Sequence, residues 1–152
     1  MEILANTIQL TNGNPTYHQD SDEQKVILQG VYRQLFKENR DFDFFYNSRL
    51  DSQYLNGNLT VRELVRECIC SDIMYTNYIL AMNSNDRFVQ LCFERVLGRE
   101  ATQAETYSWS SLLASEGLRS FAEKLTDSDE YKAAFGDYTV PYRRSLNLSS
   151  SD

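Results

Sequence analysis

Apolar residues recur every three or four positions between residues 21 and about 138, the spacing that places side chains on one face of an α-helix. In "SDEQKVILQGVYRQLFKEN", at 21–39, Ile27 or its neighbour Val26 and then Val31 fall on one such face. Few stretches show the strict alternation of apolar and polar residues that is typical of a half-buried β-strand. The pattern therefore predicts seven or eight short helices and an all-α fold.

Start and stop signals separate these helices. Thr60 is followed three residues later by Glu63, and Thr102 by Glu105, which is the spacing of a capping box at a helix N-terminus. Glycines such as Gly98 follow the last apolar residue of several segments, where a helix commonly ends. The predicted helices cover 21–39, 41–57, 60–69, 71–82, 85–98, 102–117, 118–125 and 128–136.

Two stretches of the chain resemble each other. Each has an aromatic-led helix, a connection, an amphipathic helix and a short motif, which reads "SDIMY" at 71–75 and "SDEY" at 128–131. When Ser71 is set against Ser128, apolar positions coincide: Val61, Leu64 and Cys68 fall on Leu118, Phe121 and Leu125. We interpret this as an internal duplication of two helical halves that share one core. Chance similarity between short helices is the alternative.

The periodic region also predicts the domain organisation. Residues 1–20 contain Gly13 and Pro15 and show no sustained periodicity, so a flexible leader is expected there. A single compact helical domain is expected at 21–144, and a flexible tail at 145–152.

Composition and charge narrow the classes of function. The chain has 22 acidic and 15 basic residues and a net charge of −7, without a basic stripe that could neutralise phosphates, so nucleic acid is not an expected partner. No apolar run approaches the roughly 20 residues that span a bilayer, and the N-terminus lacks the pattern of a secretory signal. An intracellular protein without a membrane span is therefore expected.

Residues suited to catalysis or metal binding are few. The only histidine, His18, lies in the predicted leader, away from any nucleophile in the helical region. The three cysteines, Cys68, Cys70 and Cys92, lack the spacing of a metal site or a disulfide framework, and buried thiols are expected. We therefore predict no enzyme activity, no catalytic residue, no metal and no bound cofactor.

Paired arginines suggest contacts instead. Arg62 and Arg66 lie four residues apart on the polar face of an amphipathic helix, and Arg95 and Arg99 repeat that spacing. The simplest interpretation of each pair is a solvated helix face. Contact with a partner protein is the alternative.

The segment "YTVPYRR", at 138–144, combines aromatic rings with guanidinium groups, the side chains enriched in interface hot spots. Its Pro141 disfavours a helix, so an extended segment is expected. Such a segment can fold back on its own domain or serve as a docking arm. The candidate partner-binding residues are Arg62, Arg66, Tyr138, Tyr142, Arg143 and Arg144.

Three motifs resemble one known family. "LDSQYLNGNLTVRELVRECICSD", "NDRFVQLCFERVLGRE" and "SDEYKAAFGDYTVPYRR" occur in the order and form typical of the phycobilisome linker domain of cyanobacteria and red algae. The resemblance covers about residues 24–144 and includes Arg62, Arg66, Tyr142, Arg143 and Arg144.

The resemblance implies a non-catalytic, all-helical scaffold for light harvesting in photosynthesis. Such a domain binds inside discs of phycobiliproteins (allophycocyanin or phycocyanin trimers or hexamers), assembles the phycobilisome and tunes energy transfer between bilins. It implies a place within the phycobilisome, on the cytoplasmic face of the thylakoid membrane. The bilins belong to the partner proteins, and no covalent chromophore is assigned to the cysteines.

Two departures refine the expectation. Leu55 replaces an arginine of the family motif, and the net charge of −7 contrasts with the basic character of many rod linkers. The first leaves no role for that arginine here, and the acidic charge favours a linker repeat of the large core-membrane linker. The alternative function is a generic helical protein-protein interaction module with a different partner. The linker hypothesis predicts that replacing Arg143 and Arg144 together by alanine weakens disc binding and leaves folding intact.

Overall fold

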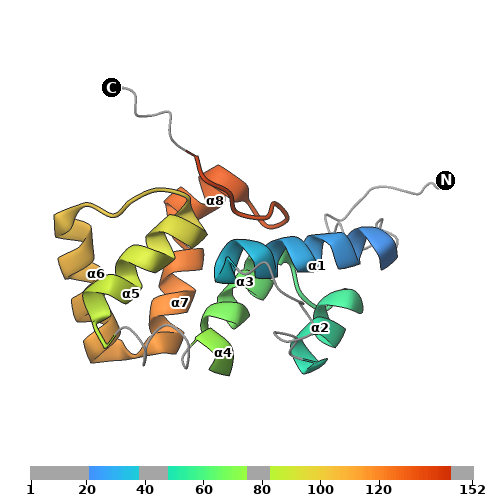
Figure 1. Cartoon of the computed structure of the whole chain (residues 1–152), viewed down its shortest axis with the longest axis horizontal. Helices are drawn as coiled ribbons and strands as arrows, with labels where there is room; N and C mark the ends of the chain where they lie inside the picture. The colour runs from blue at the N-terminus through green and yellow to red at the C-terminus, as the bar shows by residue number, and fades with distance from the viewer. Residues whose placement is uncertain (1–20, 38–47, 75–82, 145–152) are drawn as a thin grey trace.

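The computed structural model describes residues 21–37, 48–74 and 83–144 (Figure 1), and every secondary-structure element among them is helical. The all-α prediction is therefore confirmed. The predicted leader and tail, His18, and parts of the helices predicted at 41–57 and 71–82 lie outside the described residues. The elements are α1 (Ser21–Phe36), α2 (Ser48–Leu55), α3 (Val61–Ile69), α4 (Asp72–Met74), α5 (Asn85–Cys92), the π-helix η4 (Phe93–Leu97), α6 (Gln103–Glu116), α7 (Leu118–Thr126) and α8 (Asp129–Phe135).

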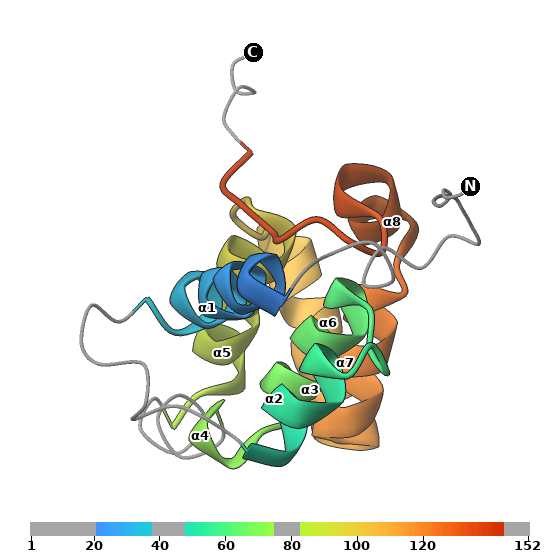
Figure 2. The same ribbon diagram turned by 90° about the vertical axis from the view of Figure 1, so that its right-hand side faces the viewer.

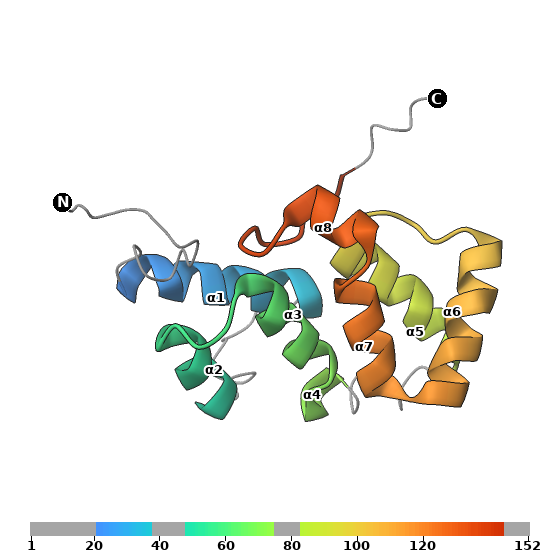
Figure 3. The ribbon, with the colours of Figure 1, turned by 180° about the vertical axis from the view of Figure 1, so that it is seen from behind.

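The helices form two groups that meet along α3 and α7. Figures 1 and 3 show α1, α2 and α3 on one side and α5, α6 and α7 on the other, with α8 above their junction. Helices α3 and α7 pack against each other and run in opposite directions (Figure 3). Helix α1 packs against both α2 and α3, which lie beside it when the molecule is seen from its end (Figure 2).

One hydrophobic core joins the two groups. Its largest members include Tyr32 and Phe36 from α1 and Phe121 from α7, each 2 % exposed or less. Trp109 of α6 links two aromatic rings, because its own ring lies 5.8 Å from that of Phe93 and 5.7 Å from that of Phe121. Burial of each such side chain stabilises the fold by about 1.5–3 kcal/mol.

The turns that follow α3 and α7 are alike, as the predicted duplication implies. The Ser71 hydroxyl donates to the carbonyl of Cys68 at 2.7 Å and accepts from the Met74 N–H at 3.3 Å. The Ser128 hydroxyl donates to the carbonyl of Leu125 at 2.7 Å and accepts from the Tyr131 N–H at 3.2 Å. The same hydrogen bonds thus recur at the two positions that align when the halves are compared in sequence.

A π-helical turn interrupts the helix that was predicted at 85–98. The N–H of Gly98 bonds the carbonyl of Phe93 five residues earlier, which defines a wider turn than that of an α-helix. The buried residues of this segment form pairs of neighbours, and each pair begins four residues after the one before. In a regular α-helix, four residues turn about 40° beyond one full turn around the helix axis, so each pair would point about 40° away from the last. The wider turn keeps the later pairs facing the core. The pairs are Phe88 and Val89, Cys92 and Phe93, and Val96 and Leu97.

Both predicted capping boxes are confirmed. The Thr60 N–H donates to the Glu63 carboxylate at 2.8 Å, and the Glu63 N–H donates to the Thr60 hydroxyl at 3.0 Å. The equivalent distances for Thr102 and Glu105 are 2.9 and 3.1 Å. Among the described helices, none is long and apolar enough to cross a membrane.

Candidate functional site: the C-terminal strap

Residues 136–144 follow α8 as a segment without regular secondary structure, which we call the C-terminal strap. Its first anchor is Arg62 of α3, whose N–H donates to the carbonyl of Asp137 at 3.0 Å. The Arg62 side chain also donates to the Asp137 carboxylate at 2.8 Å and bonds Asp127 at the end of α7. Arg62 therefore ties the strap to both central helices, and its side chain is only 18 % exposed.

The middle and the end of the strap are held as well. The Val140 side chain lies against Gly30 of α1, since a Cβ added to that glycine would be 3.8 Å from a Val140 methyl carbon. Pro141 is buried. Further on, the Arg144 N–H donates to the carbonyl of Gly98 at 2.9 Å. The backbone of the strap is thus folded back on the domain.

Gly98 is required where the strap crosses the end of η4. Its φ of +80° lies in the left-handed region that favours glycine. A Cβ at this position would also clash with the carbonyl oxygen of Tyr142, at a separation far below van der Waals contact. The predicted helix stop at Gly98 therefore has a second role, because it admits the strap backbone.

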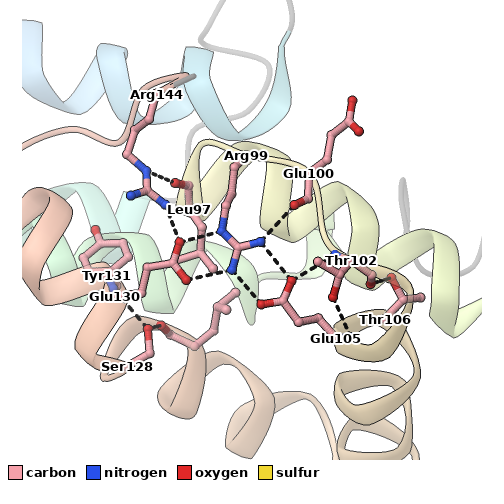
Figure 4. A network of polar contacts seen from close by, with 11 residues as sticks. Leu97, Arg99, Glu100, Thr102, Glu105, Thr106, Ser128, Glu130, Tyr131 and Arg144 are labelled. Atoms are coloured by element: carbon pink, nitrogen blue, oxygen red, sulfur yellow. Dashed lines mark hydrogen bonds and ion pairs between the residues drawn. The ribbon is translucent and has the colours of Figure 1, made fainter. Parts of the chain in front are cut away.

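Arg144 fastens the strap with its side chain. Its Nε donates to the carbonyl of Leu97 at 2.7 Å, and its guanidinium forms an ion pair with Glu130 of α8 (Figure 4). The guanidinium carbon also lies 5.9 Å from the centre of the Phe135 ring, within cation–π distance. Arg144 thus contacts both η4 and α8.

Arg99 extends this network to α6 (Figure 4). Its guanidinium bonds the Glu105 carboxylate at 2.8 and 2.7 Å and the Glu130 carboxylate at 2.6 and 2.8 Å. The hydrogen bond with Arg99 lowers the pKa of Glu105 to about 2, and the same partner lowers the pKa of Glu130. Two bidentate carboxylates therefore fix one guanidinium between α6 and α8.

Tyr142 and Arg143 are the strap residues that turn outward. Their side chains are 52 % and 53 % exposed. The edge of the Tyr142 ring contacts Phe135, with ring centres 5.1 Å apart. Arg143 forms only long ion pairs, 3.7 Å to Glu94 and 4.0 Å to Glu100. The strap therefore presents one aromatic ring and one loosely held cation to the outside.

The other candidate partner-binding residues are held within the domain to different degrees. Arg66 bonds Glu67 at 3.0 Å, and Tyr138 is half-buried, which raises the pKa of its hydroxyl. The structure does not test partner binding for any of the six residues, so that part stays a prediction. Four of the six, Tyr138, Tyr142, Arg143 and Arg144, lie on the strap. Arg62 of α3 bonds the strap at Asp137, whereas Arg66 of α3 makes no bond to the strap among the described residues.

Similarity to known proteins covers the helices and the strap together. The family model described as "Phycobilisome Linker polypeptide" matches residues 19–144, which include every helix given above and the whole strap. The chain belongs to this linker family.

Curated relatives of the linker family are 37–38 % identical to this chain over the aligned residues. The phycobilisome rod-core linker polypeptide cpcG of Pyropia yezoensis is 38 % identical over 124 residues, 80 % of this chain and 53 % of the relative. Rod-core linker CpcG3 of Mastigocladus laminosus is 38 % identical over 82 % of this chain and 48 % of its own length. The photosystem I-associated linker protein CpcL of Synechocystis sp. is 37 % identical over 78 % of this chain and 47 % of its own length. The chain thus spans about half the length of these relatives.

The cysteines of this linker domain are mostly inaccessible. Cys68 and Cys92 are buried, as predicted, and burial raises the pKa of both thiols. Cys70 is half-buried, and burial raises its thiol pKa too. Within the described part of the chain, no group of three or more His, Cys, Asp or Glu residues could hold a metal ion.

Sequence reasoning missed how the strap is fastened. The solvated-face interpretation is wrong for Arg62 and Arg99, whose guanidiniums lie in ion-pair networks at 18 % and 30 % exposure. Glu130 was not predicted to take part, although it bonds both Arg99 and Arg144. A sequence signal existed in the separate motifs "LGRE" and "SDEY", but nothing in their spacing shows that they meet the final "YRR" in space.

Proposed function

We propose that this chain is a non-catalytic linker that binds phycobiliprotein discs and thereby takes part in phycobilisome assembly. The observation that carries the proposal is the family match over residues 19–144. The strap supports it, because a fixed backbone presents Tyr142 and Arg143 without the entropy cost of ordering a loose arm.

The position within the phycobilisome follows as a finer proposal. Two of the relatives described above are named rod-core linkers, so we propose the junction of rod and core, with the core-membrane linker repeat as the alternative. In either position the domain would lie on the cytoplasmic face of the thylakoid membrane. We propose that bilins stay on the partner proteins and that the domain influences energy transfer through aromatic and charged side chains placed near them.

Within the strap, different residues receive different roles. We propose that Tyr142 and Arg143 contact the disc, whereas Arg62 and Arg144 position the strap through bonds to Asp137, Gly98 and Glu130. Aromatic and arginine side chains are the types that most often dominate interface energies. For Arg66 and Tyr138, contact with the disc stays a prediction.

These roles change the mutational test. The double substitution of Arg143 and Arg144 cannot separate contact from stability, because Arg144 belongs to the ion-pair network. The sharper variants are Arg143→Ala and Tyr142→Ala, which are expected to weaken disc binding about 10-fold each. Arg143→Ala should leave the unfolding midpoint unchanged, whereas Tyr142→Ala should lower it slightly because the ring contact with Phe135 is lost. Binding is measured by titrating isolated phycocyanin and allophycocyanin discs with the tagged chain.

The same titration separates the two candidate functions. Saturable binding of either disc by the folded wild-type chain supports the linker. A folded chain that binds neither disc, at any concentration tested, favours the generic helical interaction module with another partner. Equal affinity of wild type, Arg143→Ala and Tyr142→Ala would move the contact surface away from the strap.

A further inference from the structure

A groove beside the strap has the form of a second contact surface. Its lining residues come from α5, η4, the connection between η4 and α6, and the start of α6, and Figure 1 shows where these elements lie. One hollow of about 420 Å³ is lined by Arg87, Gln90, Leu91, Glu94, Glu100 and Ala101. A second hollow of about 440 Å³ shares Gln90 and Ala101 with the first and extends to Tyr107. We call the two together the α5–α6 groove.

The acidic side chains at one end of this groove have unused capacity to accept hydrogen bonds. Glu94 and Glu100 are 50 % and 81 % exposed at their side chains, and the ion pairs to Arg143 measure 3.7 and 4.0 Å. By contrast, Glu105 and Glu130 hold Arg99 at 2.6–2.8 Å. Charge-assisted bonds normally lie between about 2.7 and 2.9 Å, so the two groove glutamates are only weakly engaged.

The other end of the groove carries an exposed aromatic ring. Tyr107 is 77 % exposed, more than any other large hydrophobic or aromatic side chain among the described residues. Between the two ends, Leu91 and Ala101 supply apolar surface on which the methylenes of a long side chain can lie. A carboxylate pair at one end and an aromatic ring at the other favour a cation with a long stem, whose charge can reach the carboxylates while its methylenes lie near the ring.

The groove is continuous with the strap pair of the proposed function. Arg143 touches Glu94 and Glu100, so a partner that covers Tyr142 and Arg143 also reaches the mouth of the groove. The lining of the first hollow has two carboxylates against one guanidinium, that of Arg87. Charge complementarity therefore selects a basic side chain from such a partner.

We propose that the α5–α6 groove receives an arginine or lysine side chain of the partner disc, with the carboxylates of Glu94 and Glu100 as its acceptors. Tyr107 covers the stem of that side chain from the far end of the groove. Arg143 then gives up its long contacts to these glutamates and is released toward a carboxylate of the partner. This inference rests on the proposed function, because it assigns the chemistry of one further contact with the same disc.

The test is the double variant Glu94→Gln and Glu100→Gln, titrated with phycocyanin and allophycocyanin discs beside the wild-type chain. We expect about a 10- to 100-fold loss of affinity and a weaker dependence of binding on salt concentration. The matched control is Glu116→Gln with Glu123→Gln, which removes the same charge from exposed positions at the end of α6 and on α7, outside the groove lining, and should bind like wild type.

A crosslink identifies the side chain that enters. Tyr107→benzoylphenylalanine, irradiated with the disc, should give a disc peptide whose crosslinked stretch contains an arginine or lysine. If wild type binds but the double variant binds equally well, or the crosslinked peptide has no basic residue, the groove proposal is wrong and the linker function stands. If wild type binds no disc, both fail.

Discussion

The two halves of the domain share a helix and a serine turn, and among the described residues only the second half carries a strap after that turn. Helices α3 and α7 have the same length, lie side by side, and end in serine turns with equivalent hydrogen bonds. After Ser128 the chain continues through α8 into the strap, which is fastened to both halves by Arg62 and Arg144. Duplication therefore explains the framework, whereas the candidate contact surface depends on an element that only the second half carries among the described residues.

The largest expected effect comes from removing the space through which the strap passes. Gly98→Ala places a Cβ against the Tyr142 carbonyl and imposes a left-handed conformation on alanine, so the free energy of unfolding should fall by about 3 kcal/mol. Urea denaturation measures the change. Gly117→Ala is the matched control, because Gly117 has φ +91° but no neighbour within 4 Å of an added Cβ. If both variants lose the same free energy of unfolding, the cause is the strained left-handed backbone of the alanine and not a clash with the strap.

A smaller effect is expected at the fastening side chain. Arg144→Ala removes the bond to Leu97, the ion pair with Glu130 and the contact with Phe135, and should cost about 1–2 kcal/mol, discounted for the partial exposure of both partners. Hydrogen exchange at strap amides should accelerate along with the loss. Arg143→Ala, one residue earlier and half exposed, should change the free energy of unfolding by no more than about 0.5 kcal/mol and should leave the exchange of the strap amides unchanged. Similar effects for the two arginines would contradict the division into contact and positioning residues.

The capping box of α6 should respond to acid through its arginine partner. Arg99 lowers the pKa of Glu105 to about 2, so the stability from this pair is complete above the ordinary glutamate range and is lost as pH falls toward 2. Glu105→Gln, which can still close the capping box, should therefore lose less stability than wild type between pH 6 and pH 3. The control is Glu63→Gln in the α3 box, where no described arginine bonds the carboxylate. A wild-type acid profile for Glu105→Gln would rule out the Arg99 pair as its source.

The smallest expected difference is between the duplicated serines. Ser71→Ala and Ser128→Ala each remove a hydroxyl that accepts one N–H and donates to one carbonyl, and each should cost about 1 kcal/mol. Unfolding in urea should give losses that agree within about 0.5 kcal/mol. A much larger loss at Ser128 would mean that α8 and the strap depend on this turn more than α4 does.

Local features of the fold could be predicted well from the sequence. Capping boxes, glycine stops and apolar periodicity act within four or five residues, so they identify α3, α6 and α7 without knowledge of the tertiary structure. The π-helical turn at Phe93–Leu97 was not predicted, because its reason is the position of the neighbouring helices around buried pairs. The duplication stays a prediction, which rests on local patterns that recur in the same order in the two halves.

The sequence by itself determined the helical elements, the pairing of the halves and the family, since each is written in residue types at short or repeated spacings. Only the tertiary structure decided what the arginines do. Arg143 and Arg144 are identical neighbours in sequence, yet one reaches outward and the other bonds Glu130 and Leu97. The physical reason is that these contacts join elements that are far apart in the chain. Leu97 and Arg144, for example, are 47 residues apart, and a local pattern does not encode which distant elements meet.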